Sequence, residues 1–231
     1  MKVGEAYLRL DKKWDMDELA SLSKLYTQCY SLVYSLSGFK TDSTDERVID
    51  WFQGAYAKYP WRGGFSTVNF YHSLYAKLPQ DARPQIKKIQ YASPGFILLE
   101  EALIVAGSLA GIVAAVTVSI DKIHDTYNKI QKGLSERKLT KLEVQLKDLE
   151  LDLARLEFVK ESKQKLIESM CIPKEIQVEL ARRCDGNELM ELKILMSLHR
   201  RIEPMAKMQR EGMLDIEVPK ETSLGNEEEK I

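Results

Sequence analysis

A segment of nineteen residues without any charged side chain lies in the middle of the chain, from Ala102 to Ile120. As one α-helix it would be about 28 Å long, close to the thickness of the hydrocarbon core of a bilayer. Its apolar side chains are stable only when lipid or other protein covers them. The segment therefore predicts either a membrane span or a buried central helix, with a β-rich conformation of Ile112 to Ile120 as a further alternative.

Small residues recur within this segment. Gly107 and Gly111 form a GxxxG pattern, which lets the backbones of two helices approach each other closely. The small residues that we predict to pack against another helix are Gly107, Gly111, Ala106, Ala110 and Ala114. The same residues dilute the large aliphatic side chains, and this makes insertion into a bilayer less favourable than for a leucine-rich helix.

Leucines follow at alternating steps of three and four residues, the spacing of the a and d positions of a coiled coil. This predicted seam consists of Leu139, Leu142, Leu146, Leu149, Leu153 and Leu156. The flanking positions are mostly acidic, so a parallel pairing with a second copy would set like charges opposite each other. A segment after the Asp185 to Asn187 turn carries Lys193, Arg200 and Arg201, which predicts an antiparallel hairpin between the two helices. Pro204 should kink or end the second of them.

The first 95 residues contain the patterns of both strands and helices. Short alternating stretches at Ala6 to Leu10 and Ile86 to Tyr91 predict strands. A helix is expected to begin after Asp15, because Glu18 completes a capping box with it. The apolar stripe of that helix consists of Leu19, Leu22, Tyr26, Cys29, Val33 and Leu36.

These patterns predict a mostly helical α+β fold with four regions. The first is a small α+β domain over 1–95, and the second is the apolar helix over 96–130, with 102–120 as the candidate transmembrane span. A coiled coil and helical hairpin follow over 131–212, and 213–231 is expected to be a flexible acidic tail.

The overall composition limits the possible partners and compartments. With a formal net charge of -1 and a pI of about 6.4, the chain has no bulk attraction for nucleic acid. Three widely spaced cysteines predict reduced thiols in a cytosolic compartment. The chain opens without the apolar stretch of a signal peptide, so we expect a cytoplasmic or cytoplasmic-membrane protein that is not secreted by that route.

The sequence predicts no catalytic residue, metal ligand or cofactor. The three histidines, His72, His124 and His199, lie in different segments without a partner at ligand spacing. Glu100 and Glu101 are expected near the positive N-terminal end of the apolar helix, where carboxylates are stabilised.

One loop resembles an element that holds an anion, because glycines allow backbone amides to approach a ligand and an arginine supplies charge. Its residues are Trp61, Arg62, Gly63 and Gly64. The alternative is a plain turn that packs Trp61 into the core. Neither a dinucleotide-binding nor a P-loop glycine pattern is present.

The leading functional hypothesis is a non-enzymatic, membrane-associated protein that forms oligomers. Its N-terminal domain would bind or sense a partner, while the apolar helix and coiled coil mediate assembly, in one version as a membrane-acting effector. One alternative is a soluble cytosolic adaptor with the apolar helix as its core. Another is a small enzyme or ligand-binding protein that uses the region 61–72, including Tyr71 and His72. The expected partners are a second copy, another protein or membrane lipid.

Overall fold

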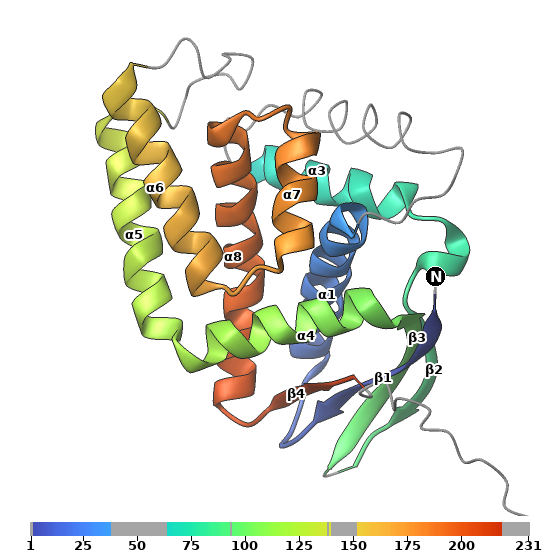
Figure 1. Ribbon diagram of the computed structural model, residues 1–231. Coiled ribbons are helices and arrows are strands. Elements are labelled where there is room, and N and C mark those ends of the chain that lie inside the picture. The colour runs from blue at the N-terminus through green and yellow to red at the C-terminus, as the bar shows by residue number, and fades with distance from the viewer. Residues whose placement is uncertain (1, 38–63, 93, 138, 140–151, 219–231) are drawn as a thin grey trace, which may run out of the picture.

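The computed structural model describes residues 2–37, 64–92, 94–137, 139 and 152–218. Within them, a small antiparallel sheet packs on one side against a larger group of helices (Figure 1). The strands are β1 (Val3–Leu10), β2 (Gln85–Gln90), β3 (Gly95–Ala102) and β4 (Leu214–Glu217). The helices are α1 (Met16–Leu36), α3 (Gly64–Lys77), the short 3-10 helix η1 (Gln80–Ala82), α4 (Leu103–Val118), α5 (Ile120–Glu136), α6 (Leu153–Ser169), α7 (Lys174–Arg183) and α8 (Glu188–Arg210). The fold is therefore α+β with a helical majority.

The sheet has the strand order β2-β3-β1-β4, so that the first strand of the chain lies inside it. All neighbours are antiparallel, and β1 pairs with β3 from Val3 opposite Ala102 to Leu10 opposite Gly95. The pairing of β4 with β1 corrects the prediction that 213–231 is a flexible tail, at least for its first residues. Leu214 and Ile216 alternate on the buried face, which is why this short segment is held in the sheet.

Helix α1 begins and packs as predicted. Asp15 accepts a hydrogen bond from the Glu18 N–H at 2.7 Å, and the Glu18 carboxylate accepts one from the Asp15 N–H at 3.0 Å. The predicted apolar stripe faces the core, with Cys29 fully buried among it. Local signals in the sequence thus place α1 correctly.

The apolar segment does not form one continuous helix. The region predicted for the apolar helix, 96–130, begins with a strand, because β3 continues to Ala102. Helix α4 follows from Leu103 and ends at Val118. After Ser119 the chain turns by 91° into α5, which allows Ile120 and Ile123 to be buried in the core. Among the described residues, no single helix has both the length and the apolar composition to cross a membrane, although the bent pair of α4 and α5 has them together.

The predicted coiled coil is not shown. α5 ends at Glu136, and α6 begins only at Leu153, where the Asp152 side chain caps its first turn. Leu139 is buried just beyond α5, Leu153 is 85% exposed and Leu156 is only half-buried. The remaining seam positions, Leu142, Leu146 and Leu149, lie outside the described residues. The described leucines of the series therefore do not share one buried seam.

Helices α6 and α8 pack together, but not as the predicted antiparallel hairpin. Because α7 returns the chain between them, α6 and α8 run in the same direction (Figure 1). The ion pairs between them also place the charges the other way round from the prediction, with the basic residue on α6 and the acidic residues on α8. Lys163 of α6 pairs with Glu188 and, at 2.9 Å, with Glu191 of α8. Pro204 lies inside α8 without ending it, since the core packing of residues on both sides compensates for the missing hydrogen bond.

Candidate functional site

The outward side of α4 is an uncharged surface that runs along the whole helix. Its exposed residues, which we call the α4 outer face, are Ile104, Gly107, Gly111, Ala114 and Val118. Ile104 is 59% exposed and Val118 is 88% exposed. The opposite side of α4 is buried against α1, α8 and the sheet. Surface helices usually carry polar side chains outward, so this face is the kind of surface that a partner covers.

Of the small residues predicted to pack against another helix, the structure brings three together on this face. Gly107, Gly111 and Ala114 point outward, Ala110 is half-buried and Ala106 is buried in the core. A side chain added at Gly107 or Gly111 would meet no atom of the described protein within 4 Å. The backbone of α4 is therefore open to close approach from outside.

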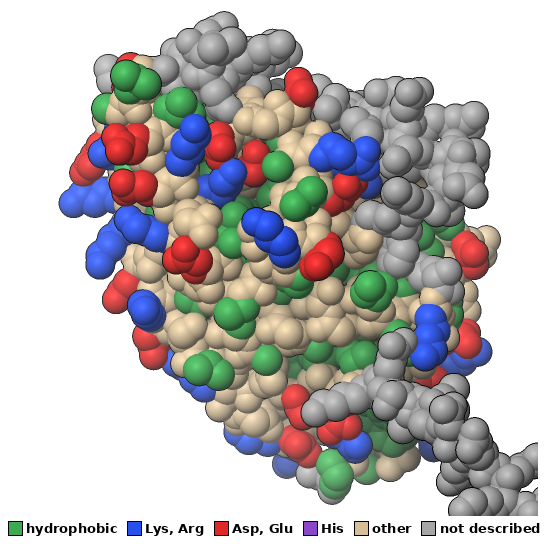
Figure 2. All heavy atoms as spheres, viewed as in Figure 1, with side chains coloured by type: hydrophobic (Ala, Val, Ile, Leu, Met, Phe, Trp, Pro, Cys, Tyr) green, Lys and Arg blue, Asp and Glu red, His purple; other side chains and the backbone are tan. Residues whose placement is uncertain are grey.

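Charged side chains surround the α4 outer face but do not cross it. Figure 2 shows the band over α4 in tan and green, whereas red and blue side chains gather above and below it. At the C-terminal end of the helix, Asp121 accepts hydrogen bonds from Arg210 at 3.0 and 3.1 Å. The face thus ends where the ion pairs begin.

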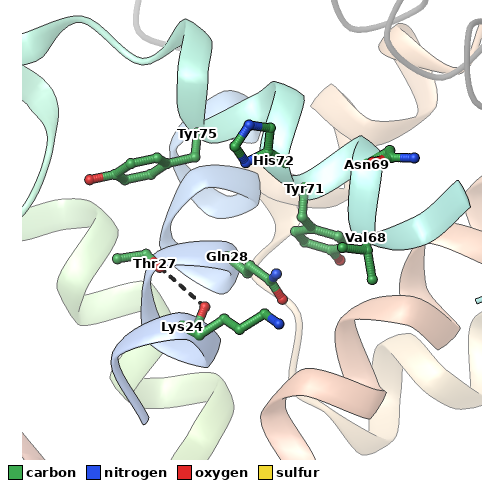
Figure 3. A pocket seen from close by; sticks show the side chains of 8 residues that line it. All are labelled: Lys24, Thr27, Gln28, Val68, Asn69, Tyr71, His72 and Tyr75. Atoms are coloured by element: carbon green, nitrogen blue, oxygen red, sulfur yellow. Dashed lines mark hydrogen bonds between the residues drawn. The ribbon is translucent and has the colours of Figure 1, made fainter. Parts of the chain in front are cut away.

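A second candidate is a groove of about 480 Å³ between α1 and α3, which we call the α1–α3 groove (Figure 3). The lining side chains are Lys24, Thr27 and Gln28 from α1, and Val68, Asn69, Tyr71, His72 and Tyr75 from α3. Lys24 and His72 are exposed, while Tyr71 is buried. None of these described lining residues carries a carboxylate, so this part of the groove is neutral to positive.

A buried arginine of α8 lies next to this groove. The Arg201 guanidinium is 3.7 Å from the centroid of the Tyr71 ring, and its Nε donates a hydrogen bond to Gln28 Oε1 at 2.8 Å. Its Nη1 donates to the Ser197 carbonyl oxygen at 3.0 Å, and Ser197 Oγ in turn donates to the Tyr71 hydroxyl at 3.1 Å. Arg201 is 8% exposed, and burial lowers its pKa. No carboxylate among the described residues forms an ion pair with it.

Glu101 is a buried carboxyl group rather than a residue at a helix end, which corrects the prediction. Glu100 and Glu101 both belong to β3 and therefore point to opposite faces of the sheet. Glu100 points outward to Lys87 at 2.8 Å, whereas Glu101 points inward and accepts a hydrogen bond from the Tyr26 hydroxyl at 2.5 Å. Burial raises the pKa of Glu101 to about 7.

Two of the three histidines lie close to one carboxylate, a grouping that the sequence did not predict. His124 Nδ1 is 2.9 Å from one oxygen of Glu203, and His199 Nδ1 is 4.0 Å from the other. His199 is fully buried and stacks on Tyr127, and burial lowers its pKa. In the part of the chain that the structure describes, no group of three or more His, Cys, Asp or Glu side chains is arranged to hold a metal ion.

The predicted ligand loop lies mostly outside the described residues. This applies to Trp61, Arg62 and Gly63, while Gly64 is the first residue of α3. Tyr71 and His72, which belong to the candidate ligand-binding region 61–72 predicted from the sequence, do line the α1–α3 groove. The other half of the groove was not predicted from the sequence, because its residues come from α1. The buried arginine next to the groove comes from α8.

Comparisons of the chain with family models, with curated proteins and with solved structures found no match.

Proposed function

We propose that this chain is a non-enzymatic interaction protein that pairs with a second copy of itself through the α4 outer face. The observation that carries the proposal is the exposure of Ile104 and Val118 at the two ends of a helix face that has no charged residue between them. Burying such a face against protein removes apolar surface from water, which stabilises association by roughly 25 cal/mol per Å² of apolar surface before the costs of ordering are subtracted.

A second copy fits this face for steric reasons. A twofold axis perpendicular to α4, between Gly107 and Gly111, brings the same two glycines of each copy together. Small residues at this spacing allow two helix backbones to come into direct contact. Because the face is uncharged, self-pairing sets no like charges opposite each other.

The ends of the helix also suit an antiparallel pair. Lys2 lies at the N-terminal end of α4, where its carbonyl oxygen accepts a hydrogen bond from the Leu103 N–H at 3.2 Å. Asp121 lies just beyond the C-terminal end, with a side chain that is 90% exposed. An antiparallel pair brings the N-terminal end of each α4, where Lys2 lies, toward the C-terminal end of the other, where Asp121 lies, and it opposes the two helix dipoles favourably.

Membrane lipid is the competing partner for the same face. One side of α4 is buried in the protein, including Val105, Leu109 and Val113, so a bilayer would contact only the outer side. This partial cover, together with the small residues, favours a protein partner over lipid. Binding of the α4 outer face to a membrane is the alternative that the experiment must distinguish from self-association.

The experiment is sedimentation equilibrium of the purified chain and of Gly111→Lys. Lysine has room at this position and is a better helix former than glycine, so the fold is expected to persist. We expect the wild type to form a dimer. The dissociation constant of the variant should be larger by about tenfold or more, because the lysines of the two copies repel each other. Ala154→Lys adds the same charge at an exposed position of α6 and should not change the dimer.

Two results would overturn the proposal. One is a wild type that stays monomeric at about 100 µM, where even a weak dimer would be populated. The other is equal weakening by Gly111→Lys and Ala154→Lys. If the monomeric wild type instead sediments with phosphatidylcholine vesicles, and Gly111→Lys does not, the face binds lipid and the self-association proposal fails.

A further inference from the structure

We propose that the α1–α3 groove binds a small organic anion, whose phosphate or carboxylate group contacts Lys24 and Gln28 and whose aromatic or apolar body lies against Val68 and Tyr75. This binding site is independent of the α4 outer face. Its volume of about 480 Å³ lies within the range of pockets that hold small ligands.

The charge of the groove favours an anion. Lys24 carries a positive charge at its rim, and none of the described residues that line it is acidic. Arg201 adds a second positive charge directly behind Tyr71 and Gln28, without a carboxylate partner among the residues that the structure describes. A charge in the protein interior is screened less than one in water, so Arg201 attracts an anion in the groove through the side chains between them.

Arg201 also orients a hydrogen-bond donor. Because its Nε donates to Gln28 Oε1, the carbonyl end of that amide is occupied and the amide NH₂ group is available to a ligand. Lys24 and Gln28 are four residues apart on α1 and therefore lie on the same side of the helix. Figure 3 shows these two side chains side by side at the groove, with the oxygen of the Gln28 amide on the side toward Lys24 and the nitrogen on the far side. An ammonium group and an amide donor on the same side of a helix can each contact an oxygen of one phosphate or carboxylate.

The opposite wall is suited to an apolar body. α3 contributes Val68, which is exposed, and the half-buried ring of Tyr75. The Tyr71 ring is held in place, since its hydroxyl accepts from Ser197 and its face contacts Arg201. An inorganic anion would leave Val68 and Tyr75 in contact with water, whereas a ligand with a ring would cover them.

Isothermal titration calorimetry with 1-naphthyl phosphate tests the proposal, since this probe joins a phosphate group to an aromatic body. We expect the wild type to bind it at least about tenfold more tightly than it binds inorganic phosphate or the uncharged 1-naphthol. Lys24→Glu should weaken binding at least about tenfold through charge repulsion. Lys160→Glu makes the same charge change at an exposed position of α6 and should bind like the wild type.

Gln28→Leu separates the amide donor from the general charge, because it leaves the net charge unchanged. This substitution should also weaken the binding of 1-naphthyl phosphate, while the binding of 1-naphthol should stay the same. The proposal is overturned if the wild type does not bind 1-naphthyl phosphate at about 1 mM, or if Lys24→Glu and Lys160→Glu bind it equally. Retention on phosphatidic acid vesicles without affinity for the soluble probe would assign the groove to a lipid headgroup and also overturn the proposal. Gly111→Lys should bind the probe like the wild type, which keeps this result separate from self-association.

Discussion

At pH 8, Glu101→Gln is expected to raise the free energy of unfolding above that of the wild type by about 1 to 3 kcal/mol. Glu101 is 2% exposed, and one of its oxygens has no hydrogen-bond partner among the described residues. Burial raises its pKa from 4.5 to about 7 in the folded state. Above that pH the folded protein must hold a buried carboxylate, whereas the unfolded chain holds a hydrated one.

The direction of the pH dependence follows from this raised pKa. The folded state binds the proton more tightly than the unfolded state, so the contribution of Glu101 to stability is complete below pH 4.5. It is lost as the pH rises from there through about 7. Glutamine does not titrate, and its carbonyl oxygen keeps the hydrogen bond from Tyr26. The advantage of Glu101→Gln should therefore disappear at acidic pH.

Urea unfolding of both proteins at pH 4 and pH 8 measures this difference. Glu100→Gln is the matched control, because Glu100 is the adjacent residue on the exposed face of the same strand. Its effect should stay within about 0.5 kcal/mol at both pH values. A difference between Glu101→Gln and wild type that is the same at pH 4 and pH 8 would show that the carboxyl group does not titrate as described.

How much the sequence predicted depends on how far apart the interacting residues are. The capping box of Asp15 and Glu18 and the stripe of α1 lie within one helix, and both were predicted correctly. The strand β3 and the helix α4 were merged into the region 96–130, because Phe96 to Leu99 of the strand are apolar like the helix and hide the change in periodicity. The bend at Ser119 depends on burying Ile120 in the core, which only the tertiary fold determines.

The candidate sites show the same limit. A helix that is apolar all round does not reveal from its sequence which side faces outward, so the exposure of Gly107 and Gly111 required the packed structure. In the groove, Gln28 and Arg201 are 173 residues apart. From the sequence, Arg201 was only one of three basic residues expected to face the leucine-rich helix, although it is buried against Tyr71. No local pattern brings such residues together.

The second large effect concerns the end of the chain. We expect Leu214→Ala to lower the free energy of unfolding by about 2 to 4 kcal/mol, because it removes a buried side chain that the core cannot fully replace. Leu214 is buried on β4 opposite Leu10 of the interior strand β1. Since β1 also pairs with β3, loosening β4 weakens the sheet on which α4 and α8 pack. Far-UV circular dichroism during urea unfolding measures the loss for the whole protein.

Asp215→Ala on the same strand provides the comparison that separates a strand from a tail. Asp215 is exposed, and its bond from Gln209 is long at 3.3 Å, so its loss should cost no more than about 0.5 kcal/mol. If 213–231 were flexible, Leu214→Ala and Asp215→Ala would have the same small effect. A strand requires them to differ, because its alternate residues face the core and the solvent. Equal midpoints for the two variants would therefore contradict the closing of the sheet by β4.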